Sequence, residues 1–241
     1  MLPGSPTAIS CENHPMIETV FLDAGGVLVH PNFDRVAAAL QRHGVRATGE
    51  ALRIVEPLAK RDLEDPSFIR GSDDDSRGLV YFAAVLRRAG IEIDDRVREA
   101  LTELRAYHAA NNLWEIPDPD LIPFLARLLA RGLRRVVVSN ANGTLHAHFE
   151  RLGLTRHFEA VFDSHVEKVE KPDPRFFEIA LERSGSRKET TVHVGDFYEI
   201  DVVGARRAGL DAILLDPANV NEDRDCVRVR TLGELATRLG A

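Results

Sequence analysis

Two acidic segments carry much of the chemistry that this sequence offers. Asp23 directly follows the apolar run Thr19–Leu22, and a pair of glycines comes soon after it. Far along the chain, Asp196 and Asp201 bracket a short segment that follows a second apolar run, residues 191–194. Open α/β sheets bind their ligands at the carboxyl ends of the strands. We therefore expect the three carboxylates to meet at one sheet edge, where they repel one another unless a cation lies among them.

Residues that suit a phosphate group lie between these acidic segments. Ser139 and Asn140 follow the run Val136–Val138, and Lys171 precedes Pro172 at the start of a helical pattern. A hydroxyl and the backbone N–H groups of such a turn can hold a phosphoryl oxygen. The lysine ammonium can balance negative charge on the phosphate and on a nearby carboxylate. Carboxylates that share a site with a phosphate suit Mg²⁺.

The elements that position these residues alternate along the chain. Apolar and β-branched runs predict strands at Thr19–Leu22, Arg135–Val138, Ala160–Phe162, Thr191–Val194 and Ala212–Leu215. Helical patterns occur at Pro123–Ala130, Thr144–Leu152, Pro174–Ser184 and Asp201–Ala208. This order predicts a parallel sheet covered by helices, which is a doubly wound, Rossmann-like α/β core.

The interval between the first two strands, residues 31–116, breaks the alternation. A crossover between parallel strands needs only about a dozen residues, whereas this interval is much longer. Its apolar residues follow a helical period, as in Phe33, Val36, Ala37 and Leu40. We expect an all-helical insertion at 31–116, a core formed by 17–30 and 117–241, and a flexible tail at 1–16. Residues 114–117 would return the chain to the core.

The order of acid, hydroxyl, lysine and acid pair resembles that of the haloacid dehalogenase (HAD) superfamily of hydrolases, which are mostly phosphatases with an aspartate nucleophile. The resemblance extends from about Ile17 to Asp216. It implies that the insertion is the helical C1 cap of subfamily IA. It also implies roles for single residues, with Asp23 as the nucleophile and Lys171 as a catalytic group. The phosphate ligands would be Ser139, Asn140 and Lys171. The Mg²⁺ ligands would be Asp23, Asp196 and the carbonyl of Gly25, with Asp201 in contact with these ligands and not with the metal.

One position departs from the family pattern. The usual Asp-x-Asp-Gly motif reads Asp23-Ala24-Gly25-Gly26 in this chain. In the phosphatases of the superfamily, the second aspartate protonates the leaving group and then activates water, and general acid–base catalysis of this kind contributes about 10²–10⁴-fold. Glycine does neither. His30 and His165 are candidate replacements, while a good leaving group, as in an acyl or aryl phosphate, needs little help from an acid.

The sequence therefore predicts a Mg²⁺-dependent HAD-type phosphatase that acts on a small phosphorylated metabolite through an aspartyl-phosphate on Asp23. Three alternatives stay open. The first is a catalytically weak protein of the same fold that binds a phosphorylated ligand or a protein partner. The second is a dehalogenase. The third is a phosphonatase-like enzyme, in which Lys60, the only lysine between Pro31 and Pro119, would form a Schiff base.

Charge and composition restrict the partners and the compartment. A net charge of −7 argues against a nucleic-acid-binding protein, which usually carries a basic surface. No apolar run approaches the roughly 20 residues of a membrane span, and the first sixteen residues lack the features of a secretory signal. Cys11 and Cys226 lie outside every motif and are expected to be free thiols. These features predict a cytoplasmic enzyme and leave its oligomeric state open.

Overall fold

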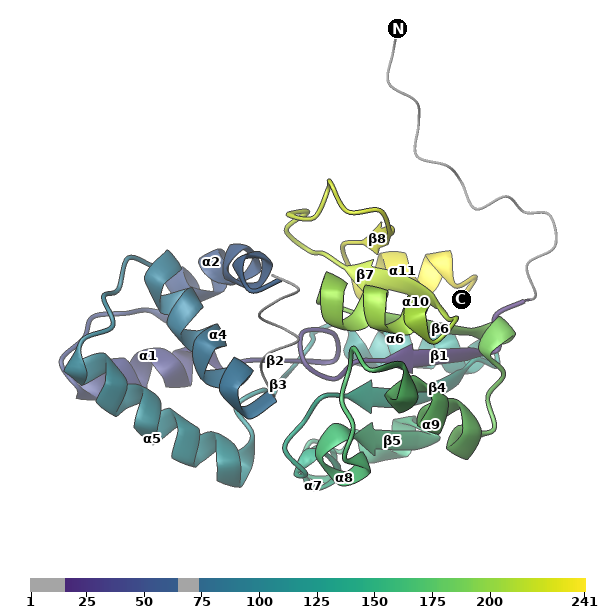
Figure 1. Cartoon of the computed structure of the whole chain (residues 1–241), viewed down its shortest axis with the longest axis horizontal. Coiled ribbons are helices and arrows are strands. Elements are labelled where there is room, and N and C mark those ends of the chain that lie inside the picture. Colours follow the sequence, from purple (N-terminus) through teal and green to yellow (C-terminus); the bar gives the residue numbers. More distant parts are fainter. Residues whose placement is uncertain (1–15, 65–73) are drawn as a thin grey trace, which may run out of the picture.

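The computed structural model describes residues 16–64 and 74–241, and it places a β-sheet beside a group of helices (Figure 1). The strands of the sheet are β1 (Thr19–Leu22), β4 (Arg134–Ser139), β5 (Ala160–Asp163), β6 (Thr191–Gly195), β7 (Asp211–Leu215) and β8 (Val227–Val229). They follow the order β5-β4-β1-β6-β7-β8, and all neighbours are parallel. The first strand therefore lies inside the sheet, as the predicted Rossmann-like core requires.

Helices cover both faces of this sheet. They are α6 (Leu121–Ala130), α7 (Leu145–Arg151), α8 (Ser164–Glu167), α9 (Pro174–Ser184), α10 (Val203–Arg207) and α11 (Leu232–Arg238), with short 3₁₀ turns at Thr155–His157 and Lys188–Thr190. Val20 and Leu22 of β1 belong to an apolar cluster that includes Leu235 of α11, whereas Phe21 belongs to another that includes Phe177 of α9. Successive side chains of a strand face opposite sides. Because both sides are covered, β1 reads as an uninterrupted apolar run.

The start of α9 is fixed by the residues that follow Lys171. The side chain of Asp173 accepts a hydrogen bond from the N–H of Arg175, and Pro174 occupies the first turn. Both features favour a helix start at this point. Gly185 ends the helix in a left-handed conformation, with φ of 63°. Lys171 is therefore held just before a well-defined helix.

A second apolar core lies in the insertion. Helices α1 (Phe33–Arg42), α2 (Gly49–Asp62), α4 (Asp74–Arg88) and α5 (Asp95–Asn111) form the group drawn to the left of the sheet in Figure 1. Leu40, Leu52, Leu86 and Leu101 of these four helices belong to one buried cluster. The insertion is joined to the sheet by a short antiparallel pair, β2 (Val29–His30) and β3 (Ile116–Pro117).

The structure differs from the expectations in a few places. The sequence does not predict strands β2, β3 and β8, because two or three residues are too few to show a period. The segment expected as a helix from Asp201 begins earlier, as a π-helical turn at Tyr198–Val202 that continues into α10. Asp201 therefore lies within the helical segment and does not start it.

Some expectations fall outside the described residues, namely most of the tail at 1–16 and the thiol of Cys11. Cys226 is a free, partly buried thiol. Among residues 16–64 and 74–241, no helix is both long enough and apolar enough to cross a membrane.

Candidate active site

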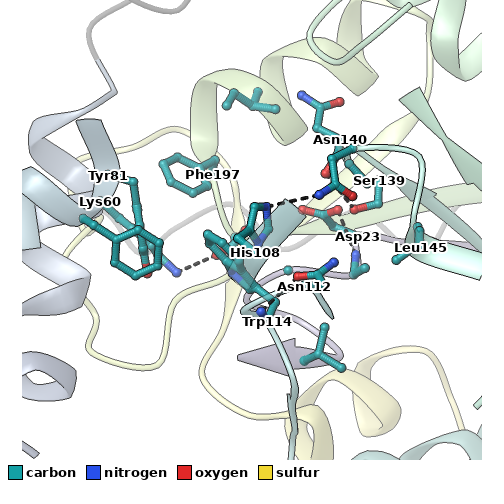
Figure 2. A pocket seen from close by; sticks show the side chains of 18 of the residues that line it. Asp23, Lys60, Tyr81, His108, Asn112, Trp114, Ser139, Asn140, Leu145 and Phe197 are labelled. Atoms are coloured by element: carbon teal, nitrogen blue, oxygen red, sulfur yellow. Dashed lines mark hydrogen bonds and ion pairs between the residues drawn. The ribbon is translucent and has the colours of Figure 1, made fainter. Parts of the chain in front are cut away.

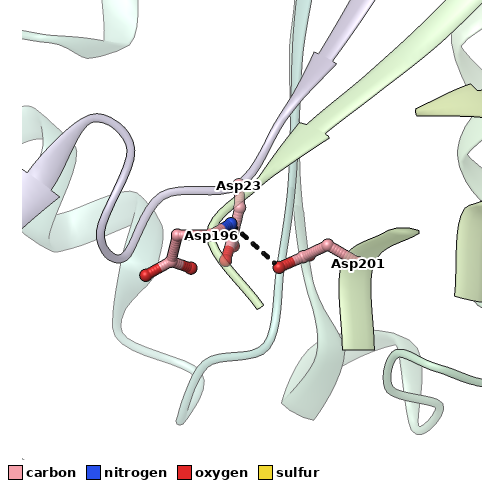
Figure 3. Close-up of side chains that lie close together, drawn as sticks. All are labelled: Asp23, Asp196 and Asp201. Carbon is pink, nitrogen blue, oxygen red and sulfur yellow. Dashed lines mark hydrogen bonds between the residues drawn. The ribbon is translucent and has the colours of Figure 1, made fainter. Parts of the chain in front are cut away.

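Strand pairing brings the predicted site residues together. Leu22 of β1 lies opposite Val137 of β4 and Val194 of β6. Asp23 and Asp196 follow the carboxyl ends of β1 and β6, and Ser139 is the last residue of β4. Carboxylate oxygens of Asp23, Asp196 and Asp201 lie within 4.8 Å of one another, as Figure 3 shows from close by.

Lys171 lies between two of these carboxylates. It is completely buried, and its Nζ is 3.0 Å from Oδ1 of Asp23 and 2.7 Å from Oδ1 of Asp201. Burial by itself lowers the pKa of Lys171, but the charges of Asp201 and Asp23 outweigh it and raise that pKa above its usual value. Burial raises the pKa of Asp23 to about 6, against the opposing effect of Lys171. The lysine is therefore a buried cation that offsets the charge of its two partners.

Asp201 is the most extensively hydrogen-bonded carboxylate of the three. Oδ1 accepts hydrogen bonds from Lys171 and from Nε2 of His193, at 2.7 and 3.0 Å. Oδ2 accepts hydrogen bonds from the peptide N–H groups of Asp196 and Phe197, at 3.2 and 3.0 Å. Burial raises the pKa of Asp201, yet Lys171 and His193 together bring it below its usual value. Asp201 therefore positions Lys171 and the loop that carries Asp196. His193, whose Nε2 bonds to Asp201, is a site residue that the sequence does not predict.

The side chain of Asn140 is also occupied within the protein. Its Nδ2 donates to the carbonyl of Lys171 at 2.9 Å, and its Oδ1 accepts the N–H of Lys171 at 2.8 Å. Asn140 thus fixes the backbone of Lys171, so a phosphate contact would have to come from the main chain. Ser139 is buried at the end of β4, and it lines the same cavity as Asp23.

The insertion contributes a second ammonium group, on Lys60 of α2. Its Nζ lies 2.5 Å from Oδ2 of Asp196 and 3.2 Å from Oε1 of Glu56. Burial lowers the pKa of Lys60, but these two carboxylates raise it above its usual value. A Schiff-base lysine must be a neutral amine when it attacks, and Lys60 is held here as a cation. In the sequence, Lys60 stands out because it is the only lysine of the insertion.

A cavity of about 420 Å³ separates the sheet edge from the insertion. Figure 2 shows Asp23 and Ser139 across the cavity from Lys60 and Tyr81, with Trp114 and His108 between them. His165 lines this cavity as well. The other candidate replacement for the missing acid, His30, bonds Asp118 at 3.0 Å in the β2–β3 region and does not line the cavity.

The two glycines after Asp23 meet different surroundings. Gly26 has φ of +73°, and a Cβ there would lie 1.8 Å from Oδ2 of Asp196, so only glycine fits. Gly25 shows no such positive φ. A Cβ on Gly25 would lie 3.2 Å from Nε1 of Trp114 and 3.3 Å from its Cδ1. A side chain at position 25 would therefore be in tight contact with the indole of Trp114.

The donor set fits a Mg²⁺ ion. Asp23 and Asp196 present hard carboxylate oxygens from adjacent strands, which is the ligand chemistry that Mg²⁺ prefers. Four carboxylates line the cavity, and they are Asp23, Glu56, Asp196 and Asp201; the cationic side chains along it are Lys60, Arg105 and Lys171. The carboxylates outnumber the cations, and three of them are clustered at the sheet edge, where a bound cation reduces their repulsion.

Comparisons with known proteins agree with this geometry. A family model described as haloacid dehalogenase-like hydrolase matches residues 17–209. The chain is 31% identical to glyceraldehyde 3-phosphate phosphatase of Methanopyrus kandleri over 201 residues, which are 81% of this chain and 82% of the relative. It is 39% identical to human haloacid dehalogenase-like hydrolase domain-containing protein 3 over 192 residues, 78% and 76% of the two chains.

Solved structures share this fold over nearly the whole chain. A 2-haloacid dehalogenase from Pseudomonas syringae superposes with a TM-score of 0.59 at 26% identity, covering 93% of this chain and 99% of its own. The HAD-type hydrolase YfnB from Bacillus subtilis, bound to magnesium, superposes with a TM-score of 0.64 at 21% identity, covering 94% and 100%. With the family model matching most of its length, the chain belongs to the haloacid dehalogenase-like hydrolases.

Proposed function

We propose that the chain is a Mg²⁺-dependent phosphatase, which transfers the phosphoryl group of a small phosphorylated metabolite to Asp23 and then to water. One observation carries this proposal: the carboxylate of Asp23 faces a cavity, with the ammonium of Lys171 at 3.0 Å and the carboxylate of Asp196 beside it. The likeness to glyceraldehyde 3-phosphate phosphatase supports a small phosphorylated substrate.

The reaction divides one displacement into two. An oxygen of Asp23 forms a bond to phosphorus while the bond from phosphorus to the leaving group breaks, and water then displaces Asp23 to release phosphate. Lys171 offsets the charge that gathers on the phosphoryl oxygens, and Ser139 offers its hydroxyl to one of them. When bound by Asp23, Asp196 and the carbonyl of Gly25, Mg²⁺ would supply further positive charge at the phosphate.

We further propose that residues 31–116 act as a cap domain over a core formed by 17–30 and 117–241. Support comes from the cavity, because Lys60 and Tyr81 of the insertion line it together with Asp23 of the core. The phosphate would bind at the sheet edge, and the rest of the substrate would contact the cap. Substrate preference then depends mainly on cap residues.

The proposal is tested with phosphate esters and acetyl phosphate, assayed with Mg²⁺ and with a chelator. We expect Mg²⁺-dependent phosphate release and an acid-stable, hydroxylamine-sensitive phosphoenzyme after rapid quenching. Asp23→Asn should abolish both signals, whereas Asp95→Asn, which changes an exposed aspartate of α5, should change neither. Phosphate binding without any turnover would support the catalytically weak alternative. Halide release from 2-chloropropionate in the absence of Mg²⁺ would support the dehalogenase.

A further inference from the structure

Aromatic side chains line one part of the cavity. The ring centroids of Tyr81 and Phe82 lie 5.0 Å apart. The ring centroid of Trp114 lies 5.5 Å from that of Tyr81 and 5.6 Å from that of Phe82. Phe197 lines the same cavity (Figure 2). The hydroxyl of Tyr81 already donates to Oε1 of Glu56 at 2.8 Å. Such a wall favours a flat, apolar group, because aromatic pairs add about 0.5–1.5 kcal/mol to simple burial.

Trp114 also determines which proton donors the site holds. Its indole edge would contact the side chain of a second aspartate closely, since Nε1 lies 3.2 Å from a Cβ placed on Gly25. An indole N–H donates a hydrogen bond but does not give up its proton near neutral pH. Neither Gly25 nor Trp114 can therefore protonate a leaving group.

Nearby cationic and imidazole groups are bonded to other residues of the protein. Lys60 is already bonded to Asp196 and Glu56. Nδ1 of His108 accepts a hydrogen bond from the peptide N–H of Leu113 at 3.0 Å, so this nitrogen is engaged with the backbone.

His165 lies elsewhere along the cavity wall. A Cβ on Gly143 would come within 2.9 Å of its ring, so His165 packs against Gly143. Among the residues that the structure describes, the three atoms nearest a Cβ on Gly25 all belong to Trp114, and none of them is an acid.

Resting on the proposed function, we propose that the substrate is an aryl phosphate, the phosphate monoester of a phenolic group, and that Trp114 determines this specificity. The aryl ring binds against Trp114, Tyr81 and Phe197. An oxygen of Asp23 bonds to phosphorus while the bond from phosphorus to the aryl oxygen breaks, and the electron pair leaves on a phenolate. Phenols have a pKa of about 10, so the phenolate departs without a proton. Water then displaces Asp23, giving hydrogen phosphate and one proton, which the phenolate takes up.

Three six-membered-ring substrates separate the two parts of this proposal. Phenyl phosphate has a flat ring and a good leaving group, benzyl phosphate has a flat ring and an alkoxide leaving group, and cyclohexyl phosphate has neither advantage. We expect kcat for phenyl phosphate to exceed kcat for the other two by at least about 10², the lower end of what an acid normally contributes. We expect KM for benzyl phosphate to resemble that for phenyl phosphate, and KM for cyclohexyl phosphate to be several-fold higher.

Variants of Trp114 and Gly25 test the assigned residue. Trp114→Leu should raise KM for phenyl and benzyl phosphate several-fold while leaving KM for cyclohexyl phosphate nearly unchanged. The double variant Gly25→Asp/Trp114→Ala makes room for an acid and should raise kcat for benzyl phosphate relative to phenyl phosphate by about 10². The wild-type series needs no variant, so it decides the question even where a variant fails to fold.

Each outcome distinguishes the inference from the function on which it rests. Equal kcat values for cyclohexyl and phenyl phosphate would overturn the aryl phosphate, although the phosphatase would stand. No turnover of the three esters or of acetyl phosphate with Mg²⁺ would overturn the proposed function itself, and the inference with it.

Discussion

Replacing Lys171 with methionine tests the electrostatic design of the site. Lys171 is fully buried, with Nζ 3.0 Å from Asp23 and 2.7 Å from Asp201. Methionine is of similar volume but carries no charge, so the variant leaves two buried carboxylates without their cation. Removing one member of a buried ion pair costs about 3–5 kcal/mol. A chain of this size loses about 2–4 °C of Tm per kcal/mol, so we expect Tm to fall by about 6–20 °C.

Thermal unfolding with and without Mg²⁺ measures this effect. Mg²⁺ should recover part of the lost Tm, because a divalent cation at Asp23 and Asp196 replaces some of the missing positive charge. The matched control is Lys188→Met, at an exposed lysine, where surface substitutions usually change stability by less than about 0.5 kcal/mol. The reasoning is refuted if Lys171→Met melts within about 2 °C of that control.

The structure changes what an inactive Lys171 variant would mean. From the sequence, Lys171 is expected to act mainly on the substrate, as an ammonium near the phosphate, and only weakly on the fold. Its complete burial between Asp23 and Asp201 gives it a structural role as well. Vanadate affinity therefore has to be measured below the Tm of the variant, per folded molecule, and a weaker affinity there shows a direct effect on the phosphoryl site.

Three further outcomes follow from single contacts. Gly26→Ala should lower Tm, and calorimetry should show Mg²⁺ affinity lowered by at least about tenfold, because the added methyl group would collide with Asp196. The control is Gly44→Ala, at a glycine with a similar φ and open space around it. Its free energy of unfolding should fall only by the roughly 1–2 kcal/mol that a left-handed residue costs. Lys60→Met should tighten Mg²⁺ binding several-fold by removing a cation that lies 2.5 Å from Asp196, and weaker binding would contradict this. Burial raises the pKa of Glu64 from 4.5 to about 7, so the folded chain prefers the protonated form and wild type should lose stability as pH rises from about 4.5 to about 7. Urea unfolding at pH 5 and pH 8 should show the free energy of unfolding of Glu64→Gln rising relative to that of wild type, by at most about 3 kcal/mol at pH 8. The same dependence of that free energy on pH in both proteins would contradict this.

The sheet could be predicted from the sequence because its strands are short and buried on both faces. Such strands read as apolar runs, and β1 (Thr19–Leu22) has the bounds that its run predicts. The carboxyl ends of parallel strands share one edge, so the sequence alone assigns Asp23, Ser139 and Asp196 to one site. Asn140 shows the limit of this reasoning. Its position is the expected one, but its side chain bonds to the backbone of Lys171, and no local pattern encodes that partner.

Contacts across the insertion could not be predicted, for a physical reason. Lys60 and Asp196 are separated by 136 positions, and they meet only because α2 is oriented against the sheet edge by its own apolar cluster. Helical periodicity reports which face of a helix is buried, not which residue of another element it will meet. The single lysine of the insertion is therefore visible in the sequence, while its carboxylate partners are not.

The pair formed by Gly25 and Trp114 bears on whether the missing aspartate weakens the enzyme or specialises it. A site that had only lost a carboxylate would hold a gap at that position, since neighbouring side chains relax only partly around a deleted group. Here the indole of Trp114 lies 3.2 Å from a Cβ built on Gly25 and packs against Tyr81 and Phe82. The glycine at the position of the missing acid and the aromatic surface therefore lie side by side. That arrangement favours a phosphatase adapted to leaving groups that need no proton over a remnant of a general one.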